Sequence, residues 1–408
     1  MSRASAGVRV DGYCHSRFEA VAEEFSKNFA EHGEIGAAVS IYLEGECVVD
    51  LWGGVADQVS ARPWTRDTLA VAFSSTKGLV AICMHLLIQR GLLDLDAPVG
   101  RYWPEFACNG KEGITVAMVL AHQAGLPVWQ QTLPAGALLD WDLVTGQIAA
   151  EQPLWEPGTQ HGYHAVTIGY LEGELVRRVT GKSIGEYLRA EVAVPLAADI
   201  WIGCPREEHH RIATSYFADP NPQSPFFAKL AREPDWVGAK LINNLGGDLA
   251  PASINGAARR SAEIPAAGGI VTAYGLARAY APLSLDGSID GIRLFDEDML
   301  PLMRTTRSAS SMDTMLRIPT TFTLGFSKSW GAYALGEGEH VILGENAFGT
   351  PGFGGSIGFA DGDARLAFGY VMNFHGPGVG LNRRGQSLID AIYRTLGFRP
   401  GRTNAWVR

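Results

Sequence analysis

The sequence predicts an α+β protein, an α/β sandwich with an added helical domain, whose antiparallel sheet is built from both ends of the chain. Strand-like apolar runs separated by glycine-rich turns gather in the first 91 residues and after residue 262, whereas helical patterns joined by long loops fill the middle. We therefore expect a discontinuous sheet domain formed by residues 1–91 and 256–408, a mainly helical domain formed by residues 92–255, and an active site between them.

The N-terminal part predicts a helix, a hairpin and a strand that leads into a second helix. Residues 17–32 place their apolar side chains on one helical face. Two apolar runs, 37–43 and 47–52, are joined by Glu-Gly-Glu and indicate a β-hairpin. The short apolar run 69–73 then leads into residues 77–91, whose almost unbroken apolar content predicts a buried helix.

The remaining elements follow the same reasoning. Helices are expected over 166–179 and over 184–194, which Pro195 stops, and a further helix over 271–283. A final helix over 387–396 closes the chain. Four strand-like runs precede it, at 322–330, 340–348, 356–360 and 366–372.

Composition and charge restrict the class of protein. With 46% hydrophobic and 19% charged residues, a chain of 408 residues can bury a sizeable core. Its net charge of −9 offers no electrostatic footprint for nucleic acid or for an anionic membrane. Five scattered cysteines without CxxC spacing indicate reduced thiols, and the N-terminus lacks the apolar run of a signal peptide, so we expect a cytoplasmic protein. No cofactor is expected.

No metal site is expected either. The run Glu207-Glu208-His209-His210 lacks the spacing of a zinc-binding helix and is typical of a solvated loop. Glycine is the unusual component: 49 residues, most densely clustered over 349–358. We expect this cluster to let substrate and backbone approach each other closely.

Three serines compete for the role of nucleophile. Ser183 and Ser356 lie in Gly-x-Ser-x-Gly pentapeptides, the pattern of a nucleophile elbow. Ser183 is better explained as part of a capping box with Glu186, which opens the helix predicted over 184–194. Ser356 is followed by a strand pattern and a turn, whereas an elbow requires a helix directly after the serine.

Ser74 is the strongest candidate. It begins Ser74-Ser75-Thr76-Lys77, the one Ser-x-x-Lys match in the chain, at a junction between a predicted strand and a predicted helix. At helical positions i and i+3, Ser74 and Lys77 point to the same side. The helix N-terminus favours developing negative charge, and burial among apolar neighbours would depress the pKa of Lys77. The alternative is a capping serine with a surface lysine, although a capping serine can still be a nucleophile.

Several other segments match one family in the same order along the chain. Together with Ser74-Ser75-Thr76-Lys77, they resemble the serine β-lactamase and penicillin-binding-protein superfamily, and most closely class C β-lactamases and family VIII carboxylesterases. The resemblance covers residues 17–396 and implies a β-lactamase/transpeptidase-like fold. The matching segments are Val-Leu-Ala-His-Gln-Ala-Gly-Leu-Pro at 119–127, Trp-Glu-Pro-Gly-Thr at 155–159 leading to Tyr163-His164-Ala165, Pro-Ala-Ala-Gly-Gly at 265–269, and Gly-Thr-Pro-Gly-Phe-Gly-Gly-Ser at 349–356.

The resemblance also implies roles for individual residues. Ser74 would be the acyl-accepting nucleophile, and Lys77 would activate it. Tyr163 would act as general base toward Ser74 and then as acid toward the leaving alcohol, with Lys77 as the cation that helps it to ionise. The backbone N–H groups of Ser74 and Phe353 would form the oxyanion hole. The alternative for Tyr163 is a loop aromatic that packs on Trp155.

Substrate contacts are expected from five residues of the matching segments and neighbouring loops: Gly352, Thr350, Trp129, His164 and Asn373. Two departures from the family pattern bear on the substrate. Ala165 stands where β-lactamases place an amide, and Thr350-Pro351-Gly352 stands where they use Lys-Thr-Gly. No lysine is therefore available there to hold a β-lactam carboxylate. Both departures favour esters without a carboxylate.

The sequence thus predicts a serine esterase that hydrolyses short-chain carboxylic esters through an acyl-enzyme on Ser74. Acyl transfer by the same acyl-enzyme, weak β-lactamase or D-amino-acid peptidase activity, and a catalytically silent scaffold remain alternatives. The expected partner is a small-molecule ester, and the oligomeric state stays open.

Overall fold

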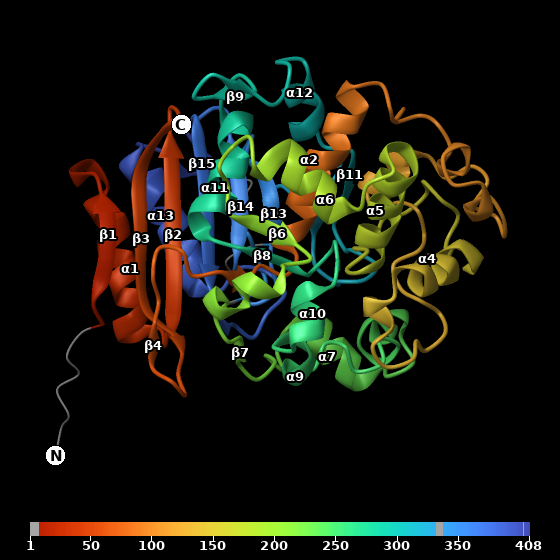
Figure 1. Ribbon diagram of the computed structural model, residues 1–408, viewed down its shortest axis with the longest axis horizontal. Helices are drawn as coiled ribbons and strands as arrows, with labels where there is room; N and C mark the ends of the chain where they lie inside the picture. Colours follow the sequence, from red (N-terminus) through yellow and green to blue (C-terminus); the bar gives the residue numbers. More distant parts are fainter. Residues whose placement is uncertain (1–7, 332–337, 403) are drawn as a thin grey trace.

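The computed structural model describes residues 8–331, 338–402 and 404–408. Its central sheet is antiparallel in the order β1-β3-β2-β15-β14-β13, with β4 paired to β3 (Figure 1). Strand β15 pairs with β2 and so joins the two ends of the chain, which confirms the predicted sheet. The strands are β1 (Val10–Cys14), β2 (Gly36–Leu43), β3 (Glu46–Asp57), β4 (Arg62–Pro63), β13 (Phe348–Pro351), β14 (Ile357–Asp361) and β15 (Leu366–Met372).

Helices cover both faces of this sheet. On one face lie α1 (Glu19–Glu31) and α13 (Arg383–Thr395), and on the other lie α2 (Ser75–Gln89) and α11 (Ala273–Tyr280) (Figure 1). The side chains of β2 alternate between the two resulting cores: Val39 and Ile41 join one hydrophobic cluster, and Ala38 and Tyr42 join the other. A central strand buried on both faces reads as a continuous apolar run, which is the pattern of residues 37–43.

Part of the glycine excess serves helix packing. Gly358 and Gly369 face each other in neighbouring strands, β14 and β15. A Cβ on Gly369 would lie 2.4 Å from the Ala273 carbonyl oxygen, and a Cβ on Gly358 would lie 2.5 Å from the Tyr280 ring. These two glycines therefore let α11 approach the sheet closely, a role different from the substrate contact expected of the cluster over 349–358.

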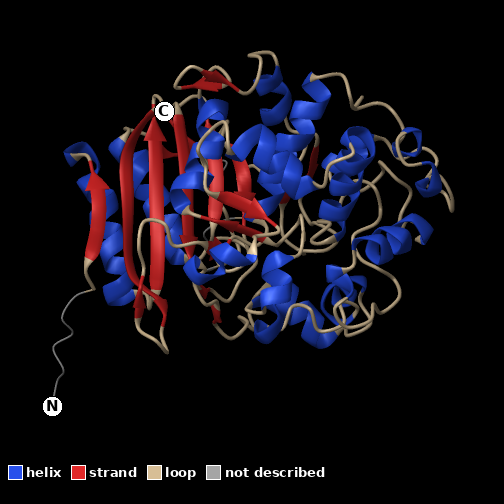
Figure 2. Cartoon of the chain, in the orientation of Figure 1, coloured by secondary structure: helices blue, strands red, loops and turns tan. Residues whose placement is uncertain are grey.

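Helices and long loops make up the other side of the molecule (Figure 2). Helix α2 packs both on the sheet and on α5 and α6, so the start of α2 lies where the two parts meet. The remaining helices are α3 (Val116–Leu120), α4 (Trp141–Ala150), α5 (Thr167–Thr180), α6 (Ile184–Leu188), α7 (Pro225–Arg232), α8 (Lys240–Asn243), α9 (Pro251–Ile254), α10 (Ala257–Ser261) and α12 (Met299–Arg304).

Small sheets connect distant segments. Strand β8 (Gly269–Val271) pairs with β5 (Ala70–Val71) and β6 (Ile200–Ile202), and so links the segments predicted to be separate domains. The division into 1–91 with 256–408 and 92–255 stays a prediction. The other paired strands are β7 (Tyr216–Phe217) with β16 (Phe374–His375), β9 (Ser288–Ile289) with β10 (Ile292–Arg293), β11 (Ser308–Ser310) with β12 (Thr320–Phe322), and β17 (Arg399–Pro400) with β18 (Trp406–Val407).

Two predicted strands are wrong. Most of 322–330 and 340–348 is loop, held by single bridges such as Ser327 to Gly349 and Trp330 to Val341. Their apolar side chains are buried as loop residues, and apolar content alone does not distinguish such loops from strands. The helix expected over 271–283 begins at Ala273 because Thr272 caps it.

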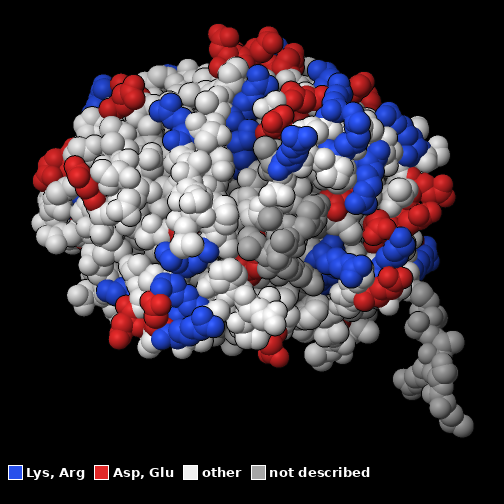
Figure 3. Space-filling view, turned by 180° about the vertical axis from the view of Figure 1, so that it is seen from behind, with Lys and Arg blue, Asp and Glu red and all other residues white. Residues whose placement is uncertain are grey.

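Charged side chains of both signs lie interspersed on the face shown in Figure 3. Within the described ranges, no helix combines the length and the apolar character that a membrane span requires.

Candidate active site

A strained turn presents Ser74 at the start of α2. Strand β5 ends at Val71, and Phe73 then adopts a positive φ of 44°, a conformation that costs a non-glycine residue free energy. Ser74 follows as the N-cap of α2. From residue 68 to residue 87, Ser74 is the one residue that is not fully buried. The turn therefore exposes this hydroxyl at the positive end of a helix.

Lys77 lies directly beneath Ser74. Its Nζ donates to Ser74 Oγ at 2.9 Å, to the Ala165 carbonyl at 2.7 Å and to the Ala266 carbonyl at 2.9 Å. Burial lowers the pKa of Lys77 to about 7, against a smaller opposing effect of the Glu172 carboxyl on α5. Burial also raises the pKa of Glu172, to about 8. The expected depression of the lysine pKa is thus confirmed.

The hydrogen bonds of Lys77 allow it to gain and lose one proton without moving. As an ammonium it has three protons for three acceptors. As a neutral amine it keeps both carbonyl hydrogen bonds and turns its lone pair toward Ser74 Oγ. With a pKa near 7, it can therefore accept the serine proton near neutral pH.

Tyr163 stands on the other side of Ser74. Its hydroxyl hydrogen-bonds the Ser74 side chain, and the Lys77 Nζ lies 4.9 Å from the centroid of its ring. The ring stacks on Phe322 at 6.0 Å between centroids. Burial raises the pKa of Tyr163, an effect that the Ser74 hydrogen bond only partly offsets. This direction runs against the expectation that Lys77 helps Tyr163 to ionise, because burial of the tyrosine itself, together with the Asp313 charge, outweighs the Ser74 hydrogen bond.

Asp313, which the sequence analysis missed, fixes the backbone of Tyr163. Both oxygens of this fully buried carboxylate accept the Tyr163 N–H, at 3.1 Å. The same carboxylate accepts the N–H groups of Met315 and Leu316 and the hydroxyl of Thr320. No local motif marks Asp313, since its partner lies 150 positions earlier in the chain.

Two backbone N–H groups beside the Ser74 hydroxyl have no acceptor within the described residues. They are the N–H groups of Ser74 and Phe353. The Phe353 ring packs on Phe73, the residue before Ser74, at 5.8 Å between centroids. A Cβ on Gly352 would lie 2.2 Å from the Ala72 carbonyl oxygen, so only glycine lets the loop that carries Phe353 come this close to Ser74. Gly352 therefore shapes the site through its backbone.

Two expected substrate contacts are buried elsewhere. Trp129 is 2% exposed and packs on Tyr170 in the core of the helical region. His164 is 1% exposed; its Nδ1–H donates to the Gly162 carbonyl, and its Nε2 accepts the Leu126 N–H. Burial lowers the pKa of His164 to about 4, so it stays neutral. Both predictions are corrected, because loop aromatics in this region face the core.

Asn373 and Thr350 also point away from a substrate. The Asn373 amide donates to the carbonyls of Val55 and Ala56 and ties the end of β15 to β3. The hydroxyl of Thr350 lies against Gly78 in α2, and the residue is 2% exposed. Side chains alternate along a strand, so the neighbour Pro351 faces the pocket described next.

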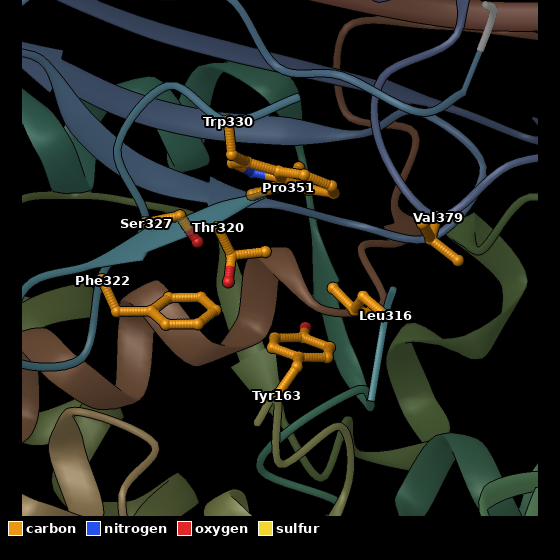
Figure 4. Close-up of a pocket in the computed structure, with 8 residues that line it drawn as sticks. All are labelled: Tyr163, Leu316, Thr320, Phe322, Ser327, Trp330, Pro351 and Val379. Carbon is orange, nitrogen blue, oxygen red and sulfur yellow. The ribbon is translucent and has the colours of Figure 1, made fainter. Parts of the chain in front are cut away.

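The pocket beside Tyr163 has about 280 Å³ of atom-free space, its solvent-facing mouth included. In Figure 4 the Tyr163 hydroxyl points into the ring of lining residues, and the Trp330 indole lies across the opposite side. None of the eight lining side chains is charged. They are Tyr163, Leu316, Thr320, Phe322, Ser327, Trp330, Pro351 and Val379.

The two competing serines have structural roles. Ser183 forms the predicted capping box with Glu186. The hydroxyl of Ser356 is buried, donates to the Ala72 carbonyl and contacts Ser75 Oγ at 3.2 Å. Ser356 therefore fastens β14 beneath the strained turn.

Comparisons with known proteins agree with this geometry. The Beta-lactamase family model matches residues 18–391. "Esterase/beta-lactamase LipL" of Mycobacterium tuberculosis is 35% identical over 378 residues, 90% of this chain and 84% of that protein. A family VIII carboxylesterase structure matches with a TM-score of 0.82 and 36% identity over 95% of this chain and all of the other. A penicillin-binding protein homolog from Caulobacter crescentus matches with a TM-score of 0.81, the same identity and the same coverage.

Proposed function

The chain belongs to the beta-lactamase family, and from that premise we propose that it is a serine esterase for short, uncharged carboxylic esters. The observation that carries the proposal is the position of the buried Lys77 amine. Two backbone carbonyls hold it, and its Nζ lies 2.9 Å from Ser74 Oγ. Relatives named as esterases support the same reaction class. The uncharged pocket and Pro351, at the second position of the family's Lys-Thr-Gly motif, favour esters over carboxylate-bearing substrates.

Each proton in the proposed reaction has a defined place. Ser74 gives its proton to neutral Lys77 and attacks the ester carbonyl, and the N–H groups of Ser74 and Phe353 receive the oxyanion. Tyr163, kept protonated by burial, gives its proton to the leaving alkoxide. The Lys77 ammonium then neutralises the Tyr163 phenolate. In deacylation, water gives a proton to Lys77 as it attacks the acyl carbonyl. The Lys77 ammonium then passes this proton to Ser74 Oγ as the bond between Ser74 and the acyl group breaks, and the carboxylic acid is released.

The test compares wild type with Ser74→Ala on p-nitrophenyl acetate, p-nitrophenyl butyrate and nitrocefin. We expect ester turnover by wild type and a loss of roughly 10⁴-fold in Ser74→Ala, because nucleophile removal abolishes the acyl-enzyme route. Ser183→Ala is the matched control: it removes a hydroxyl that caps α6 and bonds Glu263, and it should keep its activity. Ester turnover that survives in Ser74→Ala contradicts the mechanism.

The alternatives give different results in the same assays. Absence of turnover together with absence of fluorophosphonate labelling would favour a silent scaffold. Nitrocefin turnover as fast as ester turnover would favour a β-lactamase, an activity that the name of the Mycobacterium tuberculosis relative includes. Faster product release on addition of methanol would favour acyl transfer.

A further inference from the structure

The pocket beside Tyr163 contains a buried hydrogen-bond donor without an acceptor. Trp330 is 7% exposed, and its indole Nε1–H has no partner within the described residues. A buried N–H without an acceptor is unfavourable, since it has lost its water and gained nothing in return. Figure 4 shows the indole across the pocket from the Tyr163 ring, with its nitrogen on the side of Ser327.

The Thr320 hydroxyl and the Ser327 backbone, two other polar groups of this wall, are already engaged. The Thr320 hydroxyl is bound by His161 Nε2 and by the Asp313 carboxylate. The backbone of Ser327 pairs with Gly349 in both directions. The pocket therefore presents apolar surface, the Ser327 hydroxyl and a buried indole N–H that is ready to donate.

The position of Tyr163 indicates which part of an ester enters this pocket. In the proposed mechanism, the Tyr163 hydroxyl protonates the leaving oxygen and must lie beside it. The pocket that Tyr163 lines continues from that oxygen, so it faces the alcohol part of the substrate. Its atom-free space of about 280 Å³ includes the open mouth, so the enclosed part suits only a small group.

We propose that this pocket binds the alcohol part of the ester and selects an uncharged group with an ether or carbonyl oxygen, which accepts a hydrogen bond from Trp330 Nε1. The inference rests on the proposed function and names the substrate class of that same site. Trp330 is thereby a specificity-determining residue that takes no part in proton transfer.

The test uses two esters that differ by one atom. Butyl acetate and 2-methoxyethyl acetate form the same acyl-enzyme, and the second replaces one methylene by oxygen. Their kcat/KM values are measured by pH-stat for wild type and for Trp330→Phe, which keeps an aromatic ring and removes the N–H. We expect the preference for the methoxyethyl ester to fall about fivefold in Trp330→Phe, the effect of one neutral hydrogen bond. An unchanged ratio would overturn the inference.

A matched control is available in the same chain. Trp64 is 3% exposed, and its Nε1 also lacks a partner in the part of the chain that the structure describes, but it packs against Gly36 in the sheet. Trp64→Phe should leave the ratio of the two esters unchanged. Trp330→Leu removes the same donor as Trp330→Phe and should give the same fall in the ratio, so poor folding of one variant leaves the test intact.

A second pair of esters tests the placement. Butyryl and methoxyacetyl p-nitrophenyl esters carry the same replacement on the acyl side. An effect of Trp330→Phe on this pair alone would overturn the assignment of the pocket to the alcohol. Failure of the proposed function would look different: wild type would hydrolyse none of the four esters. Turnover of all four with unchanged ratios overturns only the role of Trp330.

Discussion

The two sides of Ser74 differ in how their polar groups are satisfied. On one side, Lys77 has an acceptor for each of its protons, and both backbone carbonyls that hold it belong to packed segments. On the other side, Trp330 leaves a donor free in an apolar pocket. A buried hydrogen-bond network in which every group has a partner is rigid and suits proton transfer. A pocket wall that holds an unpaired N–H, such as that of Trp330, can instead favour substrates that carry an acceptor. We therefore expect changes on the first side to alter the rate for every ester, and changes on the second to alter the choice among esters.

Lys77→Met is expected to have the largest effect. Methionine fills a similar volume but cannot accept the Ser74 proton, so kcat/KM should fall by roughly 10³-fold for every ester alike. Thermal unfolding of the variant would show whether the fold is kept. A loss of kcat/KM for only one of the esters would contradict a general role of Lys77 in the proton transfer.

The pH profile of wild type tests the same group without mutation. The folded pKa of Lys77, lowered to about 7, means that the amine is neutral above that pH and protonated below it. Log kcat/KM should therefore fall with unit slope as the pH drops below about 7, since the ammonium cannot act as base. A profile that stays level down to pH 5 would assign the base to another group.

Asp313→Asn should have an intermediate effect. The amide keeps the shape of the carboxylate but replaces one oxygen that accepts backbone N–H groups, so the Tyr163 backbone is held less firmly. We expect kcat to fall about tenfold with little change in KM, because the positioning of the proton donor is lost. Asp142→Asn, an exposed change on α4, is the control and should stay within about twofold of wild type.

Trp129→Phe should have the smallest effect on activity. Trp129 is a core residue, so its truncation leaves a cavity and should lower the free energy of unfolding by about 1–3 kcal/mol, measured by urea denaturation. Its ester preference should remain that of wild type. If Trp129→Phe changed the ratio of kcat/KM for the two acetate esters as much as Trp330→Phe does, both tryptophans would contribute to substrate choice.

Two features of the molecule were predictable from the sequence, each for a different physical reason: the helix start at Ser74, and the two central strands from opposite ends of the chain. Ser74 and Lys77 are three residues apart, and helical geometry alone places them together. The strands at 37–43 and 366–372 stand out because both faces of a central strand are buried. The segment 322–330 also buries apolar side chains, but it alternates them with polar residues and pairs mostly through single bridges.

The sequence by itself determined that Ser74 and Lys77 lie together at a helix start, because helical spacing places them on one side. It also determined the sheet built from both ends, because apolar runs mark its central strands. Tertiary structure alone decided that Trp330 faces a pocket while Trp129 lies in the core, since both are tryptophans in loops. It also decided the direction of the Tyr163 pKa and the role of Asp313. Burial and contacts between segments 150 positions apart set these properties, and neither is encoded in local sequence.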